Sequence, residues 1–147
     1  MKNIMPPTYL TIFLILAICL HFIFPIMRII HSPYTYIGIL LIVLGVWIDV
    51  WADAIFKKRN TTVKPHEKPS HLEVNGPFRI SRHPMYLGMA VVLLGIDVFL
   101  GTLVTFVFPL VFVILMEVLF IPMEEKSMEN VFGKKYLDYK KKVRRWI

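Results

Sequence analysis

The chain has 147 residues, of which 56% are hydrophobic, and its mean hydropathy is +0.63. Soluble domains contain roughly 45–50% apolar residues, and a core made by so short a chain could not bury the excess. A lipid bilayer must therefore surround much of the protein. The single cysteine, Cys19, excludes an intrachain disulfide and a cysteine-rich metal site.

Four apolar stretches are candidates for membrane-spanning helices. They cover residues 7–30, 34–56, 84–99 and 103–121, and each is near the ~20 residues that a spanning helix needs. The first has no small-residue cleavage site, so we interpret it as a retained helix and not as a signal peptide. The third is short and must be tilted or partly interfacial. With a tight turn at Gly101, the sequence predicts an all-α integral membrane fold with about four transmembrane helices.

Positive charge is concentrated in two segments outside these stretches. Residues 57–83 carry seven lysines and arginines against two glutamates, and residues 123–147 carry eight against four carboxylates. Basic segments stay on the cytoplasmic side of a membrane, so we expect both termini and the middle segment to be cytoplasmic. The formal charge of +7 is then explained by the cytoplasmic position of these segments and by their attraction to anionic lipid. A nucleic-acid partner is therefore not expected.

Both basic segments are predicted to be structured. Residues 57–83 alternate apolar side chains with prolines and an Asn75-Gly76-Pro77 turn, which is not typical of a disordered linker. We expect a folded cytoplasmic lid there. Residues 123–146 place apolar side chains at spacings of three and four, with basic residues opposite. This pattern predicts an amphipathic helix on the membrane surface, with a break at Gly133.

The start of the third apolar stretch has the chemistry of an anion site. Pro84 favours the first turn of a helix, which places His83 at its cap, beside Arg79 and Arg82. The unpaired N–H groups and partial positive charge of a helix start suit a carboxylate or a phosphate. Gly88 would let a ligand or a neighbouring helix approach closely. The alternative is an ordinary basic flank of a spanning helix.

Acidic side chains near the membrane are the second group of candidates. Glu124 and Glu125 follow the fourth stretch and suit a cationic ligand group, or alternatively form a solvated pair matched by lysines. Asp49 and Glu117 lie within apolar stretches, where a charged side chain is costly and usually functional. No partnered cluster of histidines and carboxylates indicates a metal site.

Together these segments resemble the isoprenylcysteine carboxyl methyltransferase and phospholipid methyltransferase superfamily, in particular its small prokaryotic members. The matching signature is Arg82-His83-Pro84-x-Tyr86-x-Gly88, then Glu124-Glu125, then Phe132-Gly133-x-x-Tyr136-x-x-Tyr139. The resemblance implies S-adenosylmethionine-dependent methyl transfer in the membrane, with S-adenosylhomocysteine as the product. By matching position, it implies cofactor contacts from Leu72, Phe78, Arg82, His83, Pro84, Met85, Tyr86, Gly88, Glu124 and Glu125.

The chemistry of this donor agrees with the residues. Its carboxylate suits a helix start with arginines, its ammonium suits Glu124, and its sulfonium suits aromatic faces. The acceptor is expected to be lipophilic or small. Prenylcysteine-methylating relatives have an arginine one turn before the paired acids, where this chain has Phe120, so a neutral or lipid-headgroup amine, thiol or hydroxyl is equally compatible. We expect acceptor contacts from Met89, Met116 and Phe120, and Glu117 and Asp49 are the candidates for a base.

Two other functions stay open from the sequence alone. A membrane reductase related to the sterol reductases has a similar C-terminal architecture but needs a nicotinamide site. A non-catalytic adaptor would use only the basic C-terminal helix, on anionic lipid. In each case we expect a multi-pass protein of a prokaryotic cytoplasmic membrane, with lipids as partners and no obligate protein partner.

Overall fold

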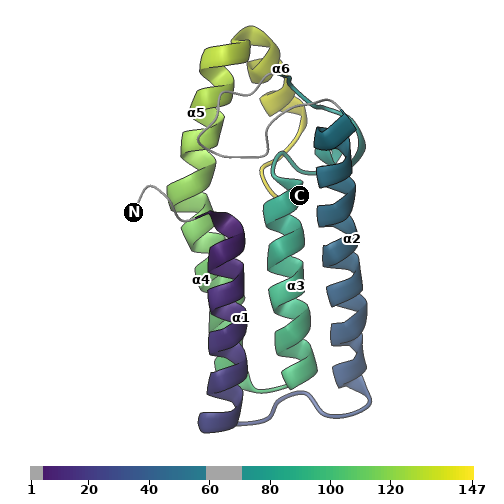
Figure 1. Ribbon diagram of the computed structural model, residues 1–147, viewed down its shortest axis with the longest axis vertical. Coiled ribbons are helices and arrows are strands. Elements are labelled where there is room, and N and C mark those ends of the chain that lie inside the picture. Colours follow the sequence, from purple (N-terminus) through teal and green to yellow (C-terminus); the bar gives the residue numbers. More distant parts are fainter. Residues whose placement is uncertain (1–4, 59–70) are drawn as a thin grey trace.

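The computed structural model describes residues 5–58 and 71–147, which form helices and connecting turns with no extended strand. Figure 1 shows the long helices side by side in one bundle. The predicted all-α fold is therefore confirmed. The α-helices are α1 (Pro6–Ile23), α2 (Ile37–Lys58), α3 (Pro84–Leu100), α4 (Val107–Leu115), α5 (Ile121–Phe132) and α6 (Lys134–Lys142). The shorter elements are the 3₁₀ turns η1 (Tyr34–Tyr36), η2 (Gly76–Arg79) and η3 (Leu103–Phe106), and the π-helical turn η4 (Met116–Phe120).

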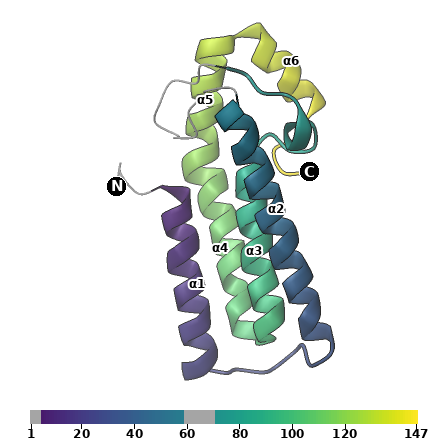
Figure 2. The same cartoon turned by 45° about the vertical axis from the view of Figure 1, so that its right-hand side comes forward.

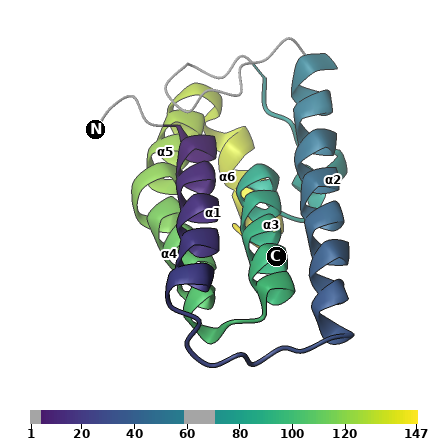
Figure 3. The ribbon, with the colours of Figure 1, turned by 60° about the horizontal axis from the view of Figure 1, so that its bottom comes forward.

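The helices alternate in direction, so chemically important segments gather at one end of the bundle. This end, which we call the cap end, holds the start of α1, the end of α2, the start of α3, and α5 and α6 (Figures 1 and 2). Viewed from the opposite, far end, α3 lies between α1 and α2 (Figure 3). α5 extends α4 past the start of α3, and α6 then folds back over the bundle (Figure 2).

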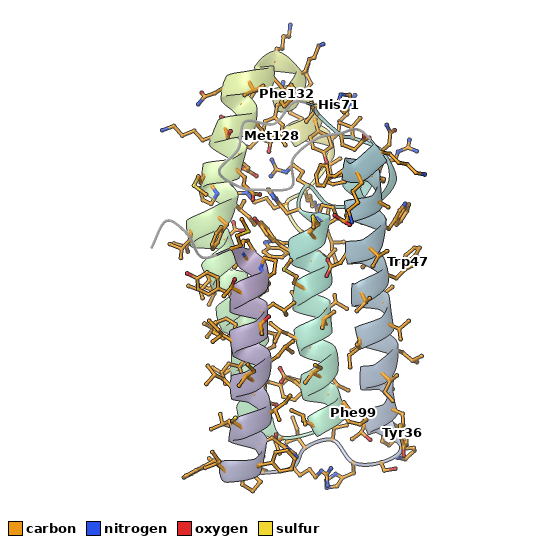
Figure 4. The ribbon with its side chains drawn as sticks, in the orientation of Figure 1. Tyr36, Trp47, His71, Phe99, Met128 and Phe132 are labelled. Carbon is orange, nitrogen blue, oxygen red and sulfur yellow. The ribbon has the colours of Figure 1, made fainter. Side chains whose placement is uncertain are left out.

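Three of the described segments are long and apolar enough to cross a membrane, judged by length and composition: Pro6–Ile23, Tyr34–Lys58 and Leu103–Phe132. α3 is a shorter apolar helix of 17 residues, as the sequence predicted. More residues are buried in α3 than in α1, α2 or α4, because α3 is enclosed by the others. By contrast, Trp47 points away from the bundle on the outer side of α2 (Figure 4) and is 56% exposed.

Glycines allow α2 and α3 to pack with their backbones in contact. Gly38 and Gly45 on α2 lie against Gly95 and Gly88 on α3. A Cβ atom on Gly45 would lie 2.6 Å from the carbonyl oxygen of Gly88, and one on Gly95 would lie 2.8 Å from that of Gly38. Small residues at helix interfaces permit such close approach in membranes, where packing drives helix association. This interface fixes the position of the α3 start.

The first predicted span is too long at its C-terminal side. α1 ends at Ile23 and not at residue 30, because Pro25 has no N–H to donate and its ring disfavours a helical conformation at the preceding residue. The chain then runs along the far end, where Arg28 pairs with Thr102 of the α3–α4 connection. The predicted turn at Gly101 is confirmed: this residue has φ +73° and its N–H donates to the Asp97 carbonyl.

The fourth predicted span, in contrast, is too short. Helix continues from α4 to Phe132 instead of ending at residue 121. Pro122 also lacks an N–H, but here the chain widens into the π turn just before it and the helix goes on. The predicted surface helix over residues 123–146 is therefore two elements, α5 and α6, and the expected break at Gly133 is confirmed. Of the predicted lid, residues 59–70 lie outside the described residues.

Candidate active site

Two parts of the sequence signature meet at the cap end: residues 82–88 at the start of α3, and the acidic pair Glu124-Glu125 in α5. His83 Nδ1 lies 3.2 Å from Glu124 Oε2, and the Tyr86 hydroxyl donates a hydrogen bond to Glu124 Oε1. The His83 and Tyr86 rings are stacked, with centroids 5.7 Å apart and planes at 6°. Pro84 begins α3 directly after His83, which holds both rings at the helix start. Thus α5 places the Glu124 carboxylate beside the start of α3, where the sequence predicts an anion-binding site.

Glu125, next in the chain, has a different environment. Its side chain is 4% exposed, and its carboxylate pairs with Arg82 Nη1 at 3.1 Å and Lys140 Nζ at 3.2 Å. Arg145 forms a two-pronged pair with it, Nε to Oε1 at 3.0 Å and Nη2 to Oε2 at 2.9 Å. A buried carboxylate is tolerated when cations surround it in this way. In residues 5–58 and 71–147, no three His, Cys, Asp or Glu side chains are grouped as metal ligands.

Both candidates for a base contact neighbouring elements, and the Glu117 side chain is 37% exposed. Glu117 lies in the π turn, where it accepts hydrogen bonds from the Arg145 guanidinium and, at 3.0 Å, from the Trp146 indole N–H. Asp49 of α2 packs directly on α3, where a Cβ atom on Gly88 would overlap Asp49 Oδ1. That buried oxygen has no hydrogen-bond partner among the described residues. A role as base stays a prediction for each.

The described part of the predicted lid packs between α2 and α6. Phe78 is buried, its ring lies 5.1 Å from that of Phe56, and its carbonyl accepts a 2.6 Å hydrogen bond from the Tyr139 hydroxyl. Tyr136 is also buried, and burial raises its pKa to about 12. Leu72 is half-buried in the same segment. Tyr139 therefore fastens α6 to the segment that leads into α3.

The predicted acceptor residues come together in the apolar core. Met89, Met116 and Phe120 are all buried in one cluster. The Phe120 ring lies 6.5 Å from that of Tyr86 and 5.7 Å from that of Tyr9 on α1. The cluster thus begins directly beneath the His83–Tyr86 stack.

Sequence reasoning missed the last residues of the chain. The basic run over residues 140–145 is typical of a solvated helix face, yet Arg145 and Trp146 contact Glu117 and, for Arg145, Glu125. The one available signal is Trp146 itself, because a large apolar residue directly after two arginines favours a return to the core. The site therefore uses more of the C-terminus than the signature indicates.

His83 gives the site a pH-dependent contribution to stability. Burial alone would lower the pKa of His83, but hydrogen bonds and charge from Glu124 and Glu125 outweigh it and raise the pKa above its ordinary 6.5. The stability gained is complete below that ordinary value and lost as pH rises through the raised one. The difference in melting temperature between the wild type and His83→Gln should be larger at about pH 6 than at about pH 9.

Thermal unfolding in detergent at both pH values measures this difference. The matched control is His31→Gln, which changes an exposed histidine at the far end. A difference that is equal at the two pH values for His83→Gln would contradict the proposed ion pair.

Comparisons with known proteins show the family to which this chain belongs. The sequence model of the phospholipid methyltransferase family matches residues 33–135. An uncharacterized protein of Haemophilus influenzae is 35% identical over 63 residues, which span 43% of this chain and the whole of that protein. No solved structure matches the chain. The match covers most of the chain and includes the signature residues from Arg82 to Gly133, so this protein belongs to the phospholipid methyltransferase family and is a membrane methyltransferase.

Proposed function

We propose that the protein takes its methyl group from S-adenosylmethionine bound at the cap end and transfers it to a lipophilic or small acceptor. The main support is the contact of His83 and Tyr86 with Glu124, which joins segments 38 residues apart. The cap end carries the described parts of the basic segments, so we propose that it lies, with both termini, on the cytoplasmic side of the membrane.

The residues at this contact fit the charges of the donor. The Glu124 side chain is 22% exposed against 4% for Glu125, so Glu124 is the carboxylate that a ligand ammonium can reach. The first turn of α3 has no side-chain cap, which leaves its N–H groups for a carboxylate. The stacked rings offer π faces to a sulfonium. When bound, the donor supplies an electrophilic methyl group on sulfur.

The chain contributes alignment and exclusion of water. Tyr86 orients the Glu124 carboxylate by its hydrogen bond and separates the polar site from the apolar cluster below. An acceptor whose tail occupies the region of Met89, Met116 and Phe120 would present its polar end at Tyr86, next to the proposed donor site. Because position 120 is not an arginine, an uncharged amine, thiol or hydroxyl is the favoured acceptor group.

Binding of S-adenosylhomocysteine to Glu124→Gln tests the donor site. Removing the charge should weaken affinity about tenfold or more, because a hydrogen bond to a charged group contributes ~1.5–3 kcal/mol and 1.4 kcal/mol is tenfold. Isothermal titration of the purified protein in nanodiscs measures it. The matched control is Glu129→Gln, which changes a more exposed acid on the same helix and should leave affinity unchanged.

Other outcomes of the titration would support one of the alternative functions or exclude Glu124 from the site. Wild-type protein that binds NADPH and not S-adenosylhomocysteine would support the reductase alternative, and protein that binds neither would support the adaptor. Equal affinity for wild type and Glu124→Gln would remove Glu124 from the site. For the acceptor, incubation with native lipid extract and isotopically labelled methyl donor, followed by mass spectrometry, identifies the product.

A further inference from the structure

The last five residues, 143–147, return to the start of α3, and we call them the C-terminal strap. The Arg82 N–H donates to the Arg144 carbonyl at 3.0 Å, and the Ser81 hydroxyl donates to the Arg145 carbonyl at 2.8 Å. The same Ser81 oxygen accepts the His83 N–H at 3.1 Å. The backbone that leads into α3 is therefore held by the strap and not by its own segment alone.

The side chain of Arg145 connects the strap to two other elements. Its guanidinium bonds Glu117 in the π turn and Glu125 in α5. These hydrogen bonds raise the pKa of Arg145 above its already high ordinary value, Glu125 contributing most, so the group stays charged. Trp146 adds an indole bond to Glu117 and packs against the apolar cluster.

One carboxylate oxygen joins Arg145 to the proposed donor site. Glu125 Oε1 lies 3.0 Å from Arg145 Nε, 3.1 Å from Arg82 Nη1 and 3.7 Å from His83 Nε2. A lysine could supply the charge, but only the planar fork of arginine grips both oxygens of Glu125 while also reaching Glu117. Without this grip, Glu125 is free to rotate, and the positions of Arg82 and His83 beside it are no longer fixed.

We propose that Arg145 is a positioning residue of the donor site: it holds Glu125 so that Arg82 and His83 stay oriented at the start of α3. The expected effect of Arg145 on donor affinity rests on the proposed function. The expected effect of Arg145 on how firmly residues 81–87 are held does not rest on it, because that effect follows from the contacts alone.

Two measurements on the full-length chain in nanodiscs test the proposal with Arg145→Ala. Hydrogen–deuterium exchange of the peptide covering residues 81–87 should become several-fold faster, because the α3 start loses its anchor. The dissociation constant for S-adenosylhomocysteine should rise about tenfold. The matched control is Lys142→Ala, which removes the same charge from an exposed neighbouring position and should change neither.

Chemical rescue separates positioning from general stabilisation. Millimolar guanidinium should restore both readouts of Arg145→Ala by occupying the vacated site, whereas equal tetramethylammonium should not. Unchanged exchange at residues 81–87 in Arg145→Ala overturns the proposal. If wild-type protein does not bind S-adenosylhomocysteine yet the exchange responds, the proposed function fails and the positioning role stands.

A second variant distinguishes a local effect at the start of α3 from a general loss of folding. Arg145→Lys keeps the charge without the fork, and it should raise exchange at residues 81–87 to an intermediate level while exchange in α2 and α4 stays as in the wild type. Faster exchange throughout the bundle in both variants would overturn the proposal in favour of a purely structural role.

Discussion

Replacing Gly45 by leucine is expected to prevent α2 and α3 from closing on each other. Even a Cβ atom there would lie 2.6 Å from the Gly88 carbonyl oxygen and 2.9 Å from the Val92 nitrogen. These are backbone atoms, which cannot turn away as a flexible side chain does, so the helices must separate. Overpacking costs ~1–3 kcal/mol in cores that can adjust, and we expect at least about 3 kcal/mol here. Unfolding in detergent and size-exclusion chromatography measure the loss.

The matched control for this experiment is the next residue on the same helix. Val46 is 48% exposed on the outer side of α2, and Val46→Leu should change stability by no more than about 0.5 kcal/mol. Gly45→Ala should fall between the two, because it adds one atom at the same contact. A Gly45→Leu protein that elutes and melts like the wild type would show that α2 and α3 do not pack through these glycines.

The second large effect is expected at Glu125. Glu125→Gln removes the charge that compensates Arg82, whose side chain is 7% exposed, and it breaks the two-pronged pair with Arg145. Breaking a buried ion pair by removing one partner costs ~3–5 kcal/mol, because the other charge is left buried without compensation. We expect a loss of this size in the free energy of unfolding, measured by denaturant titration in mixed micelles.

Glu129→Gln is the control for Glu125→Gln. Glu129 is also in α5 and pairs with Lys140 at 2.7 Å, but its side chain is 36% exposed. Exposed pairs contribute ~0–1 kcal/mol, so the loss should be small. Equal small losses for the two variants would mean that water reaches Glu125 and that no buried network exists.

These predictions assign different roles to two adjacent acids. Glu124 contacts His83 and Tyr86 and remains accessible, whereas Glu125 is buried among Arg82, Lys140 and Arg145. Neighbouring positions on a helix point in directions about 100° apart, so one acid faces the α3 start and the other faces the strap and α6. The pattern Glu-Glu predicts two carboxylates near a cation, but it carries no information about which is buried.

Hydropathy in the sequence was sufficient to locate the membrane helices, whereas the family resemblance implied that the two signature segments form one site. Helix starts and turns depend on a few neighbouring residues, which is why Pro84 and Gly101 were placed correctly. The predicted spans were wrong at two prolines: α1 ends just before Pro25, as the local rule for proline requires, whereas the helix continues through Pro122 against that rule. A proline either ends a helix or is absorbed into a wider turn, and the surrounding packing decides which.

The strap and the enclosure of the acidic residues were decided only by the tertiary structure. In the sequence, Arg145 is one more cation of a basic tail. In the structure, the chain turns back and places Arg145 between Glu117 and Glu125, which are 28 and 20 residues away. Its pairs with Glu117 and with the buried Glu125 carboxylate hold this cation in place. Since burial depends on where distant segments meet, local sequence alone determined the charges of this site, and the packing of the bundle determined which of them are held in place.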